Sequence, residues 1–107
     1  MAKSSPTQRS LKIMRERGYH AEVTEHWNQF AKIRKDLFGF VDIVCVGGGE
    51  TVAVQTTSYS NISARREKIK ASPLLKPLLD ANWSIRIHGW KKAKNGRWEL
   101  KEEHVTQ

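Results

Sequence analysis

The stretch that most constrains the fold is residues 35–58, KDLFGFVDIVCVGGGETVAVQTTS. Two apolar runs, residues 40–46 and 50–57, are separated by consecutive glycines, and this pattern predicts two strands joined by a tight turn. A phosphate-binding loop is not favoured, because such loops lead into a helix and here a strand follows the glycines. The two runs are interrupted by three polar residues: Asp42, Gln55 and Thr57. Buried polar groups need a partner or a function, so these residues form the first candidate site.

The length and charge of the chain limit its class and its partners. With 107 residues the chain is long enough for one core, so we expect residues 1–107 to form a single domain. There are 19 Lys and Arg against 11 Asp and Glu, a formal net charge of +8. Such a charge attracts polyanions, and nucleic acid is the favoured partner. The alternative is a basic surface that serves only solubility.

The lone cysteine and the lengths of the apolar segments indicate the cellular compartment of the protein. Cys45 cannot form an internal disulfide, and its place in an apolar run predicts a buried, reduced thiol. We find neither an apolar signal region at the N-terminus nor a segment approaching the roughly 18 apolar residues that a spanning helix needs. We therefore expect a cytoplasmic protein with no membrane partner.

Before the central stretch, the sequence predicts a helix and a strand. Ser5 and Pro6 are typical of a helix start, and Gly18 is typical of the position after a helix end. Residues 19–28 alternate between apolar and polar side chains, which predicts one half-buried strand. Residues 28–35 are expected to form a short turn or a helical piece.

After the central stretch, the sequence predicts helical segments and then a hairpin. Residues 63–70 form a basic helical segment, and residues 72–79 form an apolar one in which Pro77 lies in the first turn or marks a kink. Residues 85–90 and 97–101 are expected to be strands, joined by a type I′ turn at Asn95-Gly96. The predicted fold class is α/β (α+β), with a mixed central sheet flanked by helices.

Basic residues cluster near these later elements. They either contact a nucleic-acid backbone or keep exposed edges soluble. The candidates for nucleic-acid binding are Lys35, Arg65, Arg66, Lys68, Lys91, Lys92, Lys94 and Arg97.

The polar residues of the central strands can meet at one place. Gln55 and Thr57 lie two residues apart and face the same side, and Asp42 on the partner strand can face that side too. Such convergence is compatible with a nuclease, in which carboxylates hold Mg²⁺ against the scissile phosphate. The structural alternative is that Asp42 bonds a neighbouring turn, while Gln55 and Thr57 pair with backbone at a strand end.

At this point the sequence resembles a known superfamily. The order of elements, together with RERGYHAEV, GFVDIVCV and ETVAVQTTS, resembles the PD-(D/E)xK nucleases. Within them the chain is most similar to archaeal Holliday-junction resolvases and to small phage and bacterial resolvase-like proteins, over about residues 7–90. The resemblance implies a restriction-endonuclease-like core in a homodimer that hydrolyses phosphodiesters in branched or structured DNA. It also implies the cytoplasm of a bacterium or of a phage-infected host cell.

The resemblance also implies roles for individual residues. Asp42 takes the position of the metal-binding aspartate, Gln55 that of the second carboxylate and Thr57 that of the lysine. These three would be catalytic, with Asp42 and Gln55 holding Mg²⁺ or Mn²⁺. The chain departs from the pattern, because Gln55 carries no charge, Thr57 is not a cation, and no glutamate lies in residues 7–10.

Two explanations of these departures stay open. Other residues can compensate for the lost charges: Glu22 as a carboxylate, and Lys35, Arg65 or Arg66 as a cation. Alternatively, the protein is a catalytically inactive PD-(D/E)xK-fold module that binds nucleic acid or a protein. If the resemblance is misleading, the remaining interpretation is an RNA-binding protein of ribosomal type on an unrelated α+β fold.

Overall fold

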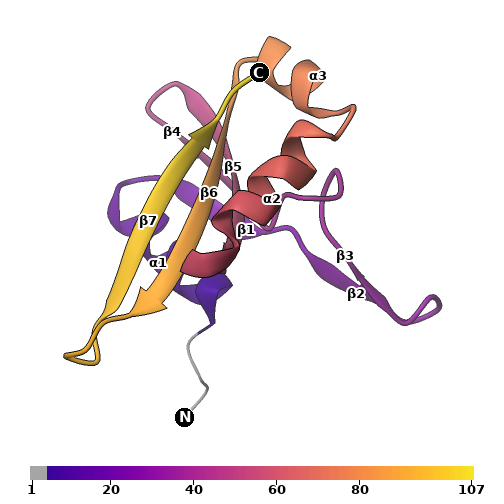
Figure 1. Cartoon of the computed structure of the whole chain (residues 1–107). Coiled ribbons are helices and arrows are strands. Elements are labelled where there is room, and N and C mark those ends of the chain that lie inside the picture. Colours follow the sequence, from indigo (N-terminus) through magenta and orange to yellow (C-terminus); the bar gives the residue numbers. More distant parts are fainter. Residues whose placement is uncertain (1–4) are drawn as a thin grey trace.

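A computed structural model describes residues 5–107, apart from the side chains of residues 26–28 and 34. Its centre is a five-stranded sheet in the order β1-β4-β5-β6-β7 (Figure 1). In this sheet β5 and β6 run parallel, and the other neighbours run antiparallel. The sheet strands are β1 (His20–Val23), β4 (Ile43–Gly47), β5 (Glu50–Ser58), β6 (Trp83–Lys92) and β7 (Trp98–Val105). The helices are α1 (Pro6–Glu16), the 3-10 helix η1 (Tyr59–Asn61), α2 (Ile62–Lys70) and α3 (Leu75–Asp80).

The central hairpin forms as the glycines predict. Gly47 pairs with Glu50, and the two residues between them, Gly48 and Gly49, have φ of 59° and 81°. Residues that carry a side chain rarely have positive φ at two successive positions. Glycine at both positions therefore allows this tight turn. The turn fixes the register of β4 against β5, and Ile43 lies opposite Val54.

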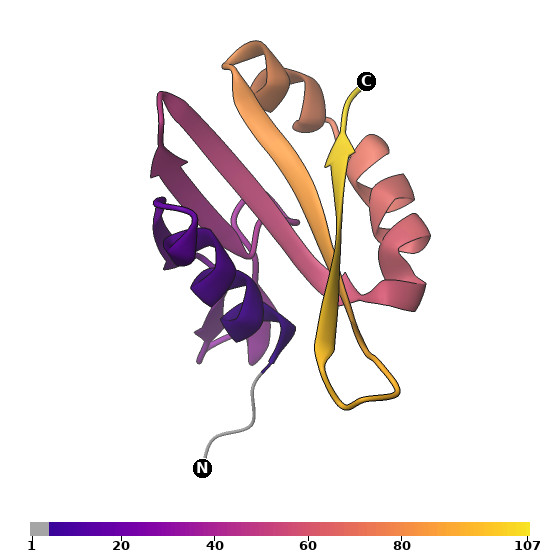
Figure 2. The ribbon, with the colours of Figure 1, turned by 90° about the vertical axis from the view of Figure 1, so that its left-hand side faces the viewer.

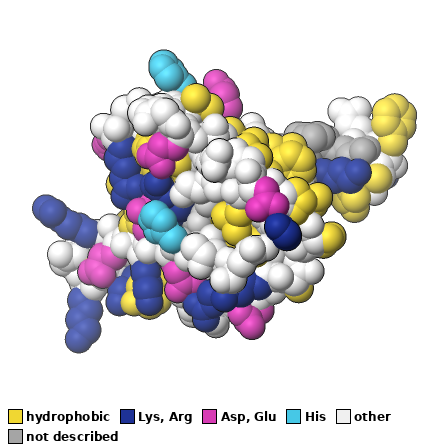
Figure 3. All heavy atoms as spheres, turned by 90° about the horizontal axis from the view of Figure 1, so that it is seen from above, with side chains coloured by type: hydrophobic (Ala, Val, Ile, Leu, Met, Phe, Trp, Pro, Cys, Tyr) yellow, Lys and Arg dark blue, Asp and Glu magenta, His cyan; other side chains and the backbone are white. Residues whose placement is uncertain are grey.

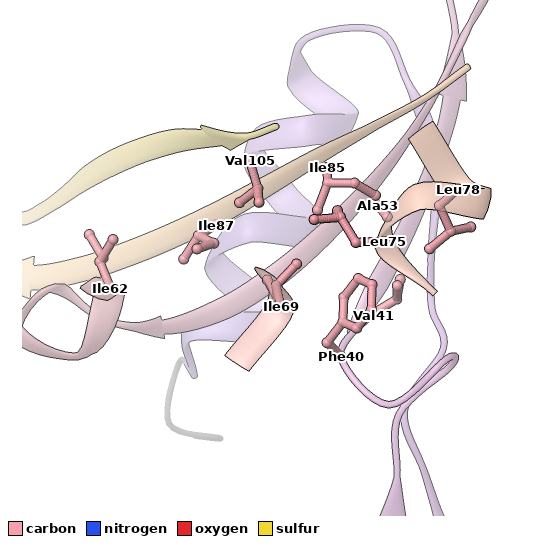
Figure 4. Packing of buried hydrophobic residues seen from close by; sticks show 10 residues of the cluster. All are labelled: Phe40, Val41, Ala53, Ile62, Ile69, Leu75, Leu78, Ile85, Ile87 and Val105. Atoms are coloured by element: carbon pink, nitrogen blue, oxygen red, sulfur yellow. The ribbon is translucent and has the colours of Figure 1, made fainter. Parts of the chain in front are cut away.

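Helices cover both faces of the sheet, which confirms the predicted α+β class with a mixed sheet flanked by helices. α1 lies on one face and α2 lies on the other (Figure 2). The alternation along β5 explains this arrangement, because Val52 and Val54 pack in the α1 core while Ala53 packs beneath α2 and α3. The second core is shown in Figure 4. It contains Phe40, Val41, Ala53, Ile62, Ile69, Leu75, Leu78, Ile85, Ile87 and Val105.

Local signals at the helices and at the cysteine are also confirmed. Ser5 Oγ accepts a hydrogen bond of 3.1 Å from the backbone N–H of Gln8, so α1 begins at the predicted cap. Pro77 lies in the first turn of α3, where its missing N–H is tolerated. Cys45 is buried in the α1 core, and burial raises the pKa of its thiol to about 11.

The predicted single strand over residues 19–28 is right only as far as Val23, and the predicted short turn or helical piece over residues 28–35 is a turn at residues 29–32 between strand residues. The chain forms β1, leaves the main sheet, and then forms β2 (His26–Asn28), which pairs with β3 (Ile33–Lys35) in a separate two-stranded sheet. Thr24 marks the departure, because its N–H and its hydroxyl donate to the carbonyls of Asp42 and Val41. We call residues 26–35 the ribbon, and it projects from the rest of the molecule (Figure 1). The predicted placement of Trp27 falls on a side chain outside the described residues.

The β6–β7 hairpin forms, but its turn is not type I′. That turn requires positive φ at Asn95 and Gly96, and among the described residues only the glycine of this pair has it, at 84°. The N–H of Gly96 donates to the carbonyl of Ala93, and the N–H of Ala93 donates to the carbonyl of Arg97. This is a longer loop that ends in a left-handed glycine. Within residues 5–107 no helix is long and apolar enough to cross a membrane.

Candidate functional site

Asp42 is the centre of the site and is buried, with 3% of its surface exposed. It lies just before β4, where β5 continues past the end of its partner strand. The N–H of Thr56 therefore has no strand opposite it and donates instead to Asp42 Oδ2 at 2.7 Å. The same oxygen accepts from Gln55 Nε2 and Thr56 Oγ1, each at 3.1 Å. Asp42 therefore bonds the strand β5 and not a neighbouring turn as in the structural alternative, and it also lines a pocket.

Gln55 lies beside Asp42 and is 4% exposed. Its amide orientation follows from its neighbour, because turning the amide over would place its oxygen against the carboxylate oxygen of Asp42. With Nε2 bonded to Asp42, Oε1 is left buried without a hydrogen-bond partner among the described residues. A buried carbonyl oxygen in this state is costly unless something else binds it.

Two further carboxylates join Asp42. The nearest ligand oxygens of Glu25, Asp36 and Asp42 all lie within 4.8 Å of one another. Glu25 directly precedes β2 and Asp36 directly follows β3, so both lie at the base of the ribbon. A tight turn returns the chain from Asp36 to Asp42, closed by the bridge between Leu37 and Val41.

The electrostatics of this group favour a positive partner. Burial and the negative charge of Asp42 raise the pKa of Asp36, while Lys68 opposes the shift. Carboxylates this close repel one another, and a proton or a bound cation would relieve that repulsion.

These residues line a pocket of about 380 Å³. It receives side chains from the start of α1, the base of the ribbon, the β4–β5 edge and α2. The lining residues are Ser5, Pro6, Thr7, Glu25, Asp36, Asp42, Gln55, Thr56 and Arg65. Thr7 Oγ1 lies 2.9 Å from Thr56 Oγ1 and ties α1 to this edge of the sheet. The pocket therefore combines carboxylate, amide and hydroxyl oxygens with one guanidinium.

The structure brings together part of the predicted catalytic set. Asp42 and Gln55 are in contact through the 3.1 Å hydrogen bond from Gln55 Nε2 to Asp42 Oδ2. Thr57 is buried but is not among the residues that line the pocket, and its neighbour Thr56 takes that place. The predicted compensating carboxylate is also different, because Glu22 is exposed on β1 while Glu25 lines the pocket.

The predicted basic residues lie on three parts of the fold, which are α2, β3 and the β6–β7 hairpin. Arg65 lines the pocket, whereas Arg66 binds Glu103 through contacts of 2.7 and 2.9 Å that raise the pKa of the guanidinium. Lys35 is exposed on β3 and Lys68 on α2. The remaining four candidates are exposed on the β6–β7 hairpin: Lys91, Lys92, Lys94 and Arg97. Figure 3 shows Lys and Arg side chains gathered at this hairpin.

Sequence reasoning missed Glu25 and Asp36. Neither belongs to a recognisable motif, and their proximity depends on a ribbon that the alternating pattern concealed. The available signal was weak: an acidic residue stands at each end of residues 26–35, which contain no other acidic residue.

A second polar group has the order of a hydrolase triad. Ser10 Oγ lies 2.8 Å from His88 Nδ1, and His88 Nε2 lies 2.7 Å from Glu102 Oε2. However, Ser10 is fully buried, and its oxygen accepts a hydrogen bond from Trp90 Nε1 at 2.9 Å. A nucleophile must reach its substrate, so this group joins α1 to β6 and β7 instead.

Comparison with known proteins does not assign the chain to a family. No family model matches it, and no curated protein matches its sequence significantly.

Proposed function

We propose that the protein is a nuclease-like DNA-binding protein that hydrolyses phosphodiesters with a divalent cation, on the PD-(D/E)xK plan. The observation that carries the proposal is Gln55 Oε1, a buried oxygen without a hydrogen-bond partner among the described residues, in a pocket with three carboxylates. An unsatisfied oxygen beside concentrated negative charge suits a cation better than it suits any neutral ligand.

The residues present fit Mg²⁺ or Mn²⁺. Both ions prefer oxygen ligands, and the pocket offers carboxylates from Asp42, Asp36 and Glu25 together with the amide oxygen of Gln55. The PD-(D/E)xK pattern has a carboxylate where this chain has Gln55. In our proposal the two ribbon-base carboxylates supply the negative charge that this exchange removes. A bound cation would polarise the phosphoryl oxygen and lower the pKa of water.

The other pocket residues have separate roles in this proposal. Arg65 attracts the phosphate and takes the place of the missing lysine as the positive group. The hydroxyl of Thr56 and its backbone N–H hold the carboxylate of Asp42 in position.

Branched or structured DNA is the proposed substrate, and a homodimer is the proposed state, both from the resemblance to resolvases. A second candidate is an inactive DNA-binding module of the same fold. The observation in its favour is the buried Thr57, which cannot supply the ammonium group of the nuclease pattern.

A nicking assay on a four-way junction separates the candidates. Wild-type protein, Asp42→Asn and the surface control Asp80→Asn are incubated with Mg²⁺ or Mn²⁺; Asp80 is exposed and pairs with Lys76. We expect nicking by the wild type and the control, and none by Asp42→Asn, which still binds the junction. Binding without nicking in either metal would favour the inactive module. Nicking that survives in Asp42→Asn would show that the proposed site is wrong.

A further inference from the structure

We propose that the ribbon is a DNA-engaging arm that places Phe30 between unstacked bases at a branch point. This inference rests on the proposed function for its substrate class, and it concerns a surface outside the pocket.

The tip of the ribbon presents an apolar side chain to solvent. Phe30 is 100% exposed and Ile33 is 49% exposed, which makes Phe30 the most exposed large hydrophobic residue that the structure describes. Figure 3 shows hydrophobic side chains at the outer end of the ribbon, with basic ones beside them. Removing a phenylalanine from water is favourable, so a partner that covers the tip gains this energy.

The charge of the ribbon indicates the chemistry of that partner. Residues 26–35, HWNQFAKIRK, contain three basic residues and no acidic one. A second ribbon would bring equal charges together, and a purely apolar surface would leave the cations unused. A nucleic acid satisfies both features, since phosphates attract the lysines and bases stack on aromatic side chains.

The base of the ribbon connects it to the pocket. Glu25 and Asp36 lie at its two ends and line the pocket with Asp42. Strands advance by about 3.3 Å per residue, and Phe30 follows Glu25 by five residues, so the tip reaches at most about 16 Å from the carboxylates. That reach is enough to cross the DNA major groove, which is about 12 Å wide. DNA with a phosphate at the pocket would therefore have the tip within a few base pairs, where a branch point leaves bases unpaired.

The variants for the test are chosen to leave the fold intact. Phe30→Ala removes the side chain, Phe30→Trp restores an aromatic group, and Val46→Ala is the control, since Val46 is 51% exposed on β4. Thermal melts should be unchanged for the Phe30 variants, because a fully exposed side chain contributes little to folding.

Binding is measured in Ca²⁺, which avoids hydrolysis, with junctions and linear duplexes of the same sequence that carry 2-aminopurine at the branch. We expect Phe30→Ala to lose about tenfold in junction affinity and much less in duplex affinity, with the fluorescence change lost. Phe30→Trp should restore binding, and Val46→Ala should match the wild type.

Each outcome tests DNA binding by the ribbon separately from phosphodiester hydrolysis at the pocket. Wild-type affinity and fluorescence in Phe30→Ala would overturn the arm, even if the protein nicks junctions. Aromatic-dependent junction binding by a protein that nicks nothing would support the arm and refute the hydrolysis. Sedimentation that shows self-association abolished by Phe30→Ala, with DNA binding unchanged, would also overturn the arm and assign the tip to a second copy.

Discussion

Glu102 offers the sharpest test of how α1 is held in place above the pocket. Its Oε2 lies 2.7 Å from His88 Nε2 and 2.8 Å from Arg17 Nη1. The hydrogen bond from His88 is the main cause that lowers the pKa of this carboxyl from 4.5 to about 2, with Arg17 assisting and burial opposing. We expect Glu102→Gln to destabilise the protein, since a neutral amide keeps the shape but loses the charge.

The magnitude follows from this pKa difference. The folded-state pKa lies below the value of 4.5 for an unperturbed group, so the ionised carboxylate favours the folded state above that pH. At about 1.4 kcal/mol per pKa unit, the shift corresponds to about 3 kcal/mol of unfolding free energy at neutral pH. This contribution is lost as the pH falls through 4.5 towards about 2.

Urea denaturation of the wild type and Glu102→Gln at several pH values measures the difference. The matched control is Glu99→Gln, on the same strand, where the carboxylate lies 3.9 Å from Lys91 and is half-exposed. We expect the gap between wild type and Glu102→Gln to be widest near pH 7 and to close towards pH 2, with little effect in the control. A gap that is absent, or that stays constant with pH, would refute the reasoning.

Three further outcomes are expected. Gly89→Ala places a Cβ against the side chain of Ile62, so urea denaturation should show a loss of about 1–3 kcal/mol in unfolding free energy; an unchanged midpoint would contradict this packing. Because the pKa of Asp36 is raised, calorimetry should show that Mn²⁺ binding weakens as the pH falls, and Asp36→Asn should reduce this dependence; an affinity that does not change with pH would argue against the carboxylate cluster as the ligand. Arg65→Ala should weaken DNA binding and reduce its salt slope by about one, whereas Arg66→Ala should change binding little, and the reverse result would move the DNA contact along α2.

The sequence was sufficient to predict that Asp42 and Gln55 lie on paired strands and can face the same side. The three consecutive glycines leave the register of the hairpin open, and in the structure the turn at Gly48 and Gly49 fixes it. The position of Thr57 followed less securely, because alternation predicts which face a side chain takes but not where the neighbouring strand ends. In the structure β4 begins at Ile43, and the pocket therefore lies beside Thr56.

The ribbon was not predictable by the same rules. Its turn has no Asn-Gly or Gly-rich signal, and Lys32 takes a positive φ of 53° without being glycine. In the alternating pattern of residues 19–28, Glu25 is the one charged residue on the apolar side, and it stands where the chain has left the main sheet. At Asn95-Gly96 a turn signal was present but predicted the wrong turn type. The same dipeptide suits both a type I′ turn and a longer loop that ends in glycine.

The two carboxylates at the base of the ribbon determine which changes of sequence the ribbon can accept. The nearest carboxylate oxygens of Glu25, Asp36 and Asp42 lie within 4.8 Å of one another. The segment between Glu25 and Asp36 therefore begins and ends at nearly the same place. Doubling the length of such a segment costs only about 0.6 kcal/mol in loop entropy. Insertions or exchanges within residues 26–35 can therefore alter what the molecule touches without displacing its acidic centre. The ribbon is in this sense an exchangeable module, and grafting a different hairpin between Glu25 and Asp36 would leave the pocket intact.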